Sequence, residues 1–296
     1  MILSKDYRTV KIGSQYFYHD VGALPRFVFD PDAIVGMDDT PEIRRDTVDR
    51  PWSHGTFFDR GFYASRLVTM SGHALAKTPQ ELYKMRDTLV HLFRTGETQW
   101  VSFYSENGTG VRHIRAALGG RITWTQMTDT YAQWRFDLYA ADPRAYSNMR
   151  YSTIYPVEAT GAGIHYPLLN STDTSVYIVD YNLDHRSIPT NAVLNNEGNE
   201  EAWPVFKVYG SFATGFSIRS SGKIITYTGG TSRNTPVVID TFAGTATYGT
   251  GDRSYNLTRR DWMSIPAYGS TSLSYHPNLV NDESTWVDVE WRSTWI

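Results

Sequence analysis

The chain has 296 residues, more than most single domains contain, so two domains of roughly 150 residues are expected. Hydrophobic residues make up 41% of the sequence and charged residues 20%, and the abundance of Gly and Tyr favours strands and turns over long helices. The net charge of −3 provides no positive field for nucleic acid, and the lack of cysteine excludes disulfides and thiolate metal sites.

The first residues predict no targeting segment. Residues 1–6 lack a basic stretch followed by an apolar one, and no run of about 20 apolar residues occurs later in the sequence. The protein is therefore expected to be made in the cytoplasm and to stay out of membranes.

One helix is clearly marked, over residues 79–94. Thr78 is a suitable N-cap, Pro79 fits the first helical position, and Glu81 can close a capping box with Thr78. Gly96 then ends the helix. Apolar residues recur between these points at helical spacing, namely Leu82, Met85, Leu89, Leu92 and Phe93. This stripe is expected to pack on the core of the first domain rather than to bind a ligand.

The rest of the first half has the pattern of strands and turns. Residues 100–118 contain two runs of β-formers around a central Asn-Gly dipeptide, which is typical of a hairpin. Residues 133–140 alternate between polar and apolar side chains, as in a half-buried strand, and Pro143 ends that strand because it cannot donate to a ladder. We therefore predict an N-terminal β-sandwich over residues 1–147 with one α-helix and a long β-hairpin.

The second half contains no comparable helix signal. Short runs of β-branched and aromatic residues are separated by Gly, Asn, Ser and Pro turns, and this spacing predicts a second β-sandwich over residues 150–296. These runs are residues 176–179, 205–209, 223–228 and 237–240. A last strand over residues 287–295 alternates Val and Trp with charged residues, so the fold class is mainly β in both halves.

Residues that could carry chemistry are isolated from one another. The eight histidines do not stand at zinc-ligand spacing, so no metal, cofactor-binding or catalytic residue is predicted. Ser220 and Lys223 fit the Ser-x-x-Lys pattern of a nucleophile, but the companion motifs are missing. Glu197 with Glu200 or Glu201 could serve a glycosidase only if the fold placed the two acids across a cleft. The chain is expected not to be an enzyme.

The order of motifs along both halves resembles the distal tail proteins of siphophages. In the first half these motifs are Ser53-His54-Gly55-Thr56-Phe57, a strand ending in Ser71-Gly72, the capped helix, the hairpin and Asp142-Pro143-Arg144-Ala145-Tyr146. In the second half they are Asn196-Glu197-Gly198, Trp203-Pro204-Val205, Val208-Tyr209-Gly210, Val238-Ile239-Asp240, residues 257–262, Ile265-Pro266 with Gly269, and a final Trp-Arg strand.

The resemblance implies a structural virion component at the tip of a phage tail, with a galectin-like or carbohydrate-module-like second domain. Proteins of this family form a ring, usually a hexamer, that joins the tail tube protein to the tail-associated fibre or lysin protein and often carries receptor-binding proteins. DNA contact is limited to passage through the channel. A carbohydrate-binding module that recognises the host receptor is the alternative, because 9 Trp and 20 Tyr residues could stack on sugars.

Two features suggest where copies of the chain meet. The hairpin has a polar tip and aromatic arms, so it can lie on a neighbouring subunit, and a closed ring would then cover its edges. Residues 30–50 are rich in charges of both signs and form either a solvated loop or a subunit-contact loop. The predicted interface residues are Arg44, Arg45, Tyr104, Glu106, Asn107 and Arg112.

Overall fold

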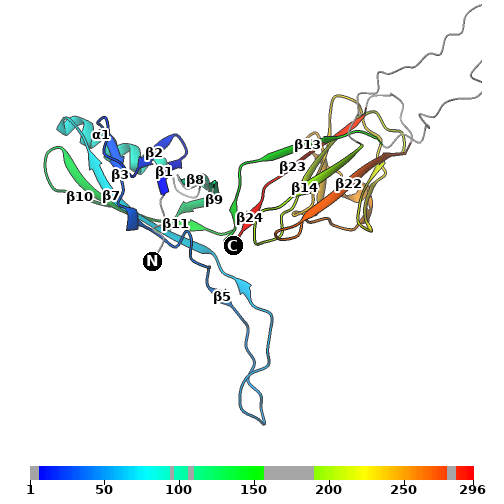
Figure 1. The fold of residues 1–296 in the computed structure, drawn as a ribbon, viewed down its shortest axis with the longest axis horizontal. Helices are drawn as coiled ribbons and strands as arrows, with labels where there is room; N and C mark the ends of the chain where they lie inside the picture. The colour runs from blue at the N-terminus through cyan, green and yellow to red at the C-terminus, as the bar shows by residue number, and fades with distance from the viewer. Residues whose placement is uncertain (1–6, 94–96, 106–109, 157–189, 279–284) are drawn as a thin grey trace, which may run out of the picture. The chain divides into compact units, whose positions relative to one another are not determined.

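The computed structural model describes residues 7–93, 97–105, 110–156, 190–278 and 285–296. The chain divides into two compact units, Met1–Asn148 with Ser293–Ile296, and Met149–Arg292. Strands dominate the described part of both units (Figure 1), which confirms the predicted mainly β class.

Seven strands of the first unit close into a barrel. Their order around the barrel is β11, β7, β3, β2, β1, β8 and β9, and β9 pairs with β11 to complete the circle. Their bounds are β1 (Tyr7–Ile12), β2 (Gln15–Tyr18), β3 (Arg26–Val28), β7 (Arg66–Leu75), β8 (Gln99–Ser105), β9 (Val111–Leu118) and β11 (Tyr131–Ala140). The predicted N-terminal sandwich is not confirmed, because the pairing of Leu138 with Leu118 and of Tyr139 with Ala117 closes the sheet on itself.

Two short strands and a 3-10 helix flank the barrel. β10 (Thr123–Gln126) pairs with β11, and β4 (Ile34–Val35) pairs with β7 directly after the 3-10 helix η1 (Pro31–Ala33). All pairings in this sheet are antiparallel except that of β2 with β3. The alternation predicted for β11 is confirmed, since the residues predicted on its apolar face are buried: Trp134, Phe136, Leu138 and Ala140.

The helix predicted near residue 79 is α1 (Pro79–Leu92), the α-helix of the described part of the chain. The Thr78 hydroxyl accepts a hydrogen bond from Glu81 N at 3.3 Å, and the Glu81 carboxylate accepts one from Lys77 N at 2.8 Å, so the capping box is confirmed. The helix ends two residues before the predicted end. Its buried stripe joins the barrel core, as predicted: Leu82, Met85, Leu89, Leu92 and the adjoining Phe93.

The predicted hairpin is formed by β8 and β9, which pair from Gln99 with Ala116 to Tyr104 with Val111. Its tip at residues 106–109 lies outside the described residues. Beyond β9 the sheet continues through β12 (Ala145–Tyr146) to β24 (Thr294–Trp295). Ser293–Ile296 therefore belong to the first unit, although sequence analysis placed them in the second domain, because β24 pairs with β12.

Two antiparallel sheets build the second unit. One sheet has the order β13 (Arg150–Ile154), β23 (Trp286–Trp291), β15 (Val205–Tyr209), β18 (Val237–Asp240), β19 (Thr245–Tyr248) and β20 (Gly251–Asp252). The other has the order β14 (Asn191–Asn195), β22 (Ser270–Pro277), β16 (Phe216–Ser220), β17 (Lys223–Tyr227) and β21 (Leu257–Arg260), which follows the 3-10 helix η2 (Ser254–Asn256).

Buried residues from both of these sheets belong to one hydrophobic cluster, for example Phe206 and Val289 from the first sheet and Phe216 and Tyr275 from the second. The strands predicted at residues 205–209, 223–228 and 237–240 are confirmed within a residue. The run at residues 176–179 lies outside the described residues.

Between β4 and β7 the chain leaves the barrel as a two-stranded arm, residues 41–64 (Figure 1). Near its base, β5 (Ile43–Arg44) pairs with β6 (Phe62–Tyr63). Farther out, Arg50 N donates to Gly55 O at 3.0 Å and Phe57 N donates to Val48 O at 2.9 Å. The charged stretch at residues 30–50 thus starts beside the barrel and continues as the outgoing half of the arm.

Candidate functional site

The root of the arm is held by one buried arginine. Arg66, the first residue of β7, is 3% exposed. Its Nη1 lies 2.9, 2.7 and 2.7 Å from the carbonyl oxygens of Gly36, Met37 and Asp39, and its Nε donates to Pro143 O at 2.8 Å. Burial lowers the pKa of Arg66, but a guanidinium stays protonated at neutral pH. Charge-assisted hydrogen bonds therefore fix the direction in which the arm leaves the barrel.

A tyrosine and a glycine complete this anchor. The Tyr7 hydroxyl donates to Asp38 Oδ1 at 2.6 Å, and burial raises the pKa of Tyr7, which keeps its proton available for that bond. Gly36 has a φ of +90°, and a Cβ at this position would lie 2.2 Å from Leu67 O. Only glycine fits a backbone that turns this close to β7.

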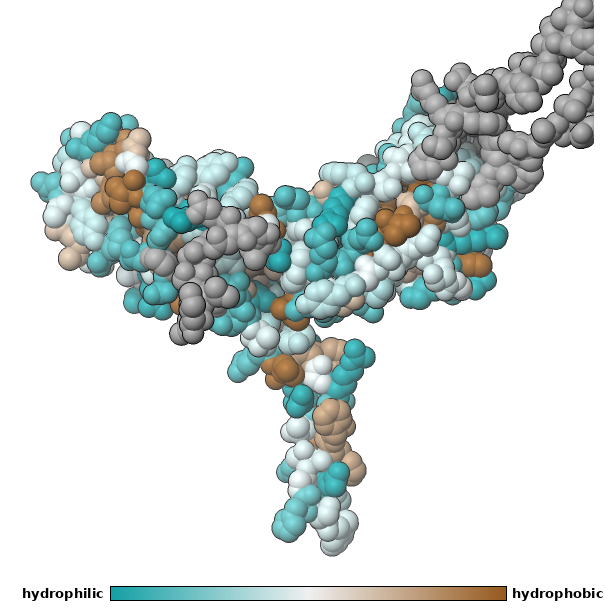
Figure 2. Space-filling view, viewed as in Figure 1, coloured by the Kyte–Doolittle hydropathy of each residue, from teal (hydrophilic) through white to brown (hydrophobic). Residues whose placement is uncertain are grey.

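The arm itself is covered with exposed aromatic and aliphatic side chains. Trp52 at its tip is 97% exposed and Phe58 is 86% exposed. The others are Ile43, Val48, Phe57, Phe62 and Tyr63. Hydrophobic and hydrophilic residues lie side by side along the arm (Figure 2). An isolated two-stranded hairpin is marginally stable in water, and several large apolar side chains exposed on one short segment indicate an interaction site.

Arginine side chains cover two of these rings. The guanidinium of Arg45 lies 5.7 Å from the ring centroid of Phe58, and that of Arg50 lies 5.5 Å from the ring centroid of Phe57. Such contacts combine an apolar face with a positive charge, a combination that is enriched in protein interfaces. The arm therefore has the composition of a protein-binding surface.

The predicted interface residues fall into two groups. Arg44 and Arg45 lie on the arm, whereas Tyr104 and Arg112 lie on the barrel strands β8 and β9. The guanidinium of Arg112 stacks on the Trp295 ring at 3.3 Å from its centroid, so it contacts β24. Glu106 and Asn107 lie outside the described residues. Sequence reasoning missed the aromatic residues of the arm, although Trp52, Phe57 and Phe58 stand among turn-forming and polar residues between Pro51 and Gly61, a pattern that indicates exposure.

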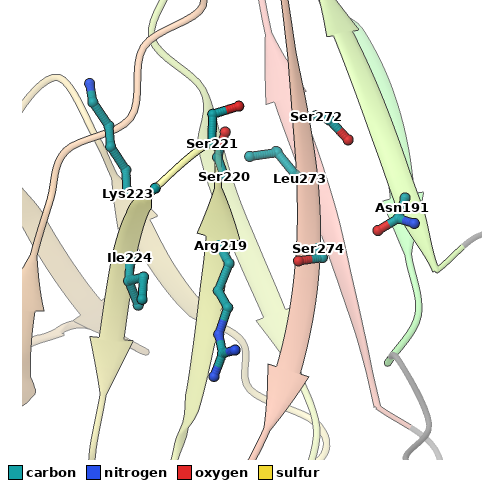
Figure 3. A pocket seen from close by; sticks show the side chains of 10 residues that line it. Asn191, Arg219, Ser220, Ser221, Lys223, Ile224, Ser272, Leu273 and Ser274 are labelled. Atoms are coloured by element: carbon teal, nitrogen blue, oxygen red, sulfur yellow. The ribbon is translucent and has the colours of Figure 1, made fainter.

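The second unit has an open pocket of about 350 Å³ on the sheet that contains β16 and β17 (Figure 3). Ser220 and Lys223 line it, at the two ends of a tight turn in which Ser221 and Gly222 have φ values of 34° and 86°. Lys223 Nζ donates to Trp262 O at 3.0 Å, and its side chain points away from the two serine hydroxyls in Figure 3. The Ser-x-x-Lys pattern therefore forms a hairpin turn without the nucleophile-base contact that such chemistry needs.

The acidic residues considered for glycosidase chemistry, Glu197, Glu200 and Glu201, lie in the segment that connects β14 to β15. Glu197 Oε1 forms an ion pair with Arg150 Nη2 at 2.7 Å. Across the described ranges, no group of three or more His, Asp or Glu side chains is placed to hold a metal ion. The single α-helix among these residues is too short and too polar to cross a membrane.

Asn196, from one of the motifs in the second half, holds a loop together. It is 2% exposed, and its Nδ2 donates to Glu200 O at 2.7 Å and to Pro266 O at 3.2 Å, while its Oδ1 accepts from Gly198 N at 2.9 Å. The motif is therefore structural, because a buried amide satisfies backbone groups of two separate loops.

Replacing Asn196 with alanine is expected to lower the free energy of unfolding of the second unit by about 2 kcal/mol, since buried backbone groups lose their partners. Urea unfolding followed by tryptophan fluorescence measures this loss. Asn195→Ala is the matched control, because that side chain is exposed and should change stability by less than about 0.5 kcal/mol. Equal effects of the two variants would show that the Asn196 contacts do not hold the loop.

The two-unit architecture has counterparts among solved structures of other proteins. No family model and no curated protein matches the sequence. Among solved structures, the chain is similar to the SPP1 Dit (gp 19.1) protein, described as a paradigm of the hub adsorption apparatus in phages that infect Gram-positive bacteria. The TM-score is 0.63 at 11% sequence identity, and the match covers 97% of this chain and 99% of that chain.

Two structures of a phage p2 baseplate are also similar. One has a TM-score of 0.49 at 11% identity, and the match covers 96% of this chain and 96% of that chain. The other has a TM-score of 0.45 at 12% identity, and the match covers 92% of this chain and 95% of that chain. The likeness to the SPP1 Dit protein shows that the class of fold is a mainly β, two-unit architecture shared with that protein. More particularly, the chain has the fold of the SPP1 Dit protein, which confirms for the fold the resemblance found in the sequence motifs.

Proposed function

We propose that this chain is a non-enzymatic structural protein of a siphophage tail tip, a hub that joins the tail tube to the tail-associated fibre or lysin protein. The observation that carries the proposal is the likeness to the SPP1 Dit protein over 97% of this chain and 99% of that one. Such coverage means that both units and their order along the chain correspond. The hub would also offer attachment points for receptor-binding proteins.

In this proposal the working form is a ring of six copies. The anchored arm supports a cyclic assembly, because it exposes apolar side chains that its own barrel leaves uncovered. In a ring with heterologous contacts, each copy can cover such a surface of the next copy, and closure leaves no surface unpaired. The arm and the barrel both belong to the first unit, so we assign ring formation to that unit.

The purified protein is expected to form a particle of six times 33.7 kDa, about 202 kDa, and to appear as a ring in negative-stain images. Light scattering coupled to size-exclusion chromatography measures the mass. The same preparation should release no product from peptidoglycan or polysaccharide. A mass of 33.7 kDa at every concentration tested, or hydrolysis of either polymer, would count against the hub.

Sugar binding by the second unit, in a galectin-like role at the host receptor, is the other candidate. The observation that favours it is the exposure of Tyr151, Tyr255 and Tyr268, whose rings could stack on sugars. Other aromatic residues of this unit lie in its core, such as Phe206, Phe216, Tyr227 and Tyr275, which is why the structural hub is preferred. Glycan binding by a monomer would reverse this preference.

A further inference from the structure

The pocket beside the β16–β17 turn lies on a positively charged sheet. The five strands of that sheet, β14, β22, β16, β17 and β21, contain four Lys or Arg residues and no Asp or Glu. The six strands of the other sheet contain two Lys or Arg residues and four Asp or Glu residues. Because the whole chain has a net charge of −3, the positive charge of this one sheet is a local feature that attracts anions.

Arg219 on β16 is the cation of this sheet that remains open to a ligand. The other three cations are hydrogen-bonded within the sheet and the segment that follows β21: Arg259 to Asp261, Arg260 to Leu257 O and Lys223 to Trp262 O. The guanidinium of Arg219 is exposed and has no hydrogen-bond or ion-pair partner among the described residues. A guanidinium presents a planar fork of donors, which fits a phosphate or a carboxylate with two parallel hydrogen bonds.

Neutral hydrogen-bonding groups surround Arg219. In the strand register Arg219 lies opposite Ser274, and Ser274 lies opposite Asn191, so the three side chains form a row across the outer face of the sheet. Three further serines line the pocket (Figure 3): Ser220, Ser221 and Ser272. Hydroxyl and amide groups donate and accept hydrogen bonds, so they complement the hydroxyl groups of a polyol.

From these groups we infer that the pocket binds an anionic polyol, such as a phosphorylated sugar, with the anionic group on Arg219 and the hydroxyl groups on Ser274 and Asn191. The pocket volume of about 350 Å³ falls in the range of small-molecule sites, roughly 300–1,000 Å³. The inference goes beyond the proposed hub, because the site lies within one copy of the second unit and needs no ring.

A histidine beside the row supports an anionic ligand. His276 Nε2 lies 3.1 Å from Ser274 Oγ on the same strand. Burial, and after it the charge of Arg219, lower the pKa of His276. An anion bound to Arg219 would offset that charge, so the pKa of His276 should rise when the ligand binds.

The same sheet is poorly suited to nucleic acid. Single-stranded nucleic acids are bound by a positively charged groove together with aromatic side chains on which the bases stack. Among the large hydrophobic residues exposed on the described molecule, the one on these five strands is Val193, which has no ring. One open guanidinium beside hydroxyl groups therefore fits a single anionic group on a small polyol better than a chain of phosphates.

Calorimetric titration of the full chain with α-glucose 1-phosphate at low ionic strength tests the site. Saturable binding is expected, and Arg219→Met should weaken it by about 10- to 100-fold, because a hydrogen bond to a charged donor is lost. Arg253→Met is the matched control, since Arg253 follows β20 of the other sheet and the variant loses the same charge. Its affinity should stay within about twofold of that of the unaltered protein.

Two further measurements test the chemistry of the ligand. Glucose and inorganic phosphate should each bind at least about 10-fold more weakly than α-glucose 1-phosphate, because each lacks one of the two groups that the pocket recognises. Titrations at pH 6 in buffers of different ionisation enthalpy count the protons exchanged on binding. His276→Gln should lower the number of protons taken up, since His276 gains protons as its pKa rises.

The results that would overturn the inference are distinct. Absence of binding, or equal losses in Arg219→Met and Arg253→Met, would show that the pocket recognises no anion. Inorganic phosphate binding as tightly as the sugar phosphate would remove the polyol from the inference. Binding lost in Tyr151→Ser with Tyr255→Ser, but kept in Arg219→Met, would place the ligand on the exposed tyrosines. The ring is measured separately by light scattering, so a failed titration leaves the proposed hub untouched.

Discussion

Replacing Arg66 with methionine should lower the free energy of unfolding of the first unit by about 3 kcal/mol, because hydrogen bonds to a charged donor contribute about 1.5–3 kcal/mol each and buried carbonyls are left without a partner. Four backbone carbonyls lose their donor in this variant, and methionine offers none. The anchor of the arm would be lost as well. Amide hydrogen exchange should therefore accelerate across residues 41–64 in addition to the shift of the urea midpoint.

Arg60→Met is the matched control, because Arg60 is an exposed arginine on the arm itself. Surface substitutions of this kind change stability by less than about 0.5 kcal/mol. Should Arg66→Met fall in the same small range, the anchor would not contribute to stability, and the direction of the arm would depend on other contacts such as Tyr7 with Asp38.

Removing residues 293–296 is expected to destabilise the first unit by about 2–4 kcal/mol, although the neighbouring residues in sequence belong to the second. The pairing of β24 with β12 is lost, together with the bonds of Ser293 N to Ser147 Oγ and of Ser147 N to Ser293 O, both 2.9 Å long. Trp295 also packs against the barrel core and under Arg112.

Hydrogen exchange resolved by mass spectrometry checks this prediction, because it reports on each strand separately. Protection should fall in β9 and β12 and stay unchanged in β16 and β22. Trp295→Ala in the full chain separates packing from strand pairing and should cost only part of the effect. Faster exchange confined to the second unit would contradict the assignment of β24 to the first.

Local signals in the sequence predicted the elements that depend on local physics. The capped helix at Pro79, the β8–β9 hairpin and the alternation in β11 each follow from a few adjacent residues. Closure of the barrel could not be predicted from such local signals. The pairing of Leu138 with Leu118 that closes it depends on the register and curvature of all seven strands. The pairing of Tyr146 with Thr294 was equally hidden, since nothing in a two-residue strand identifies its distant partner.

The candidate site was predicted in part. The charge pattern drew attention to Arg44 and Arg45, and both lie on the arm. The anchor was missed because Arg66 stands in an apolar strand and its role depends on carbonyl groups some 30 residues earlier in the chain. Exposure of Trp52 and Phe58 was missed because the pattern of apolar residues in a protruding hairpin resembles that of a buried one.

The pairing of β12 with β24 has a consequence for biosynthesis. Tyr146 and Thr294 are 148 positions apart in the chain. Because a ribosome adds roughly 5–20 residues per second, β24 is synthesised roughly 7–30 s after β12. During that interval β12 can pair with β9 on one side, while its other edge has no partner. Copies on neighbouring ribosomes of one messenger RNA would thus be exposed to premature strand exchange, a hazard that slower initiation or a chaperone at the tunnel exit would reduce.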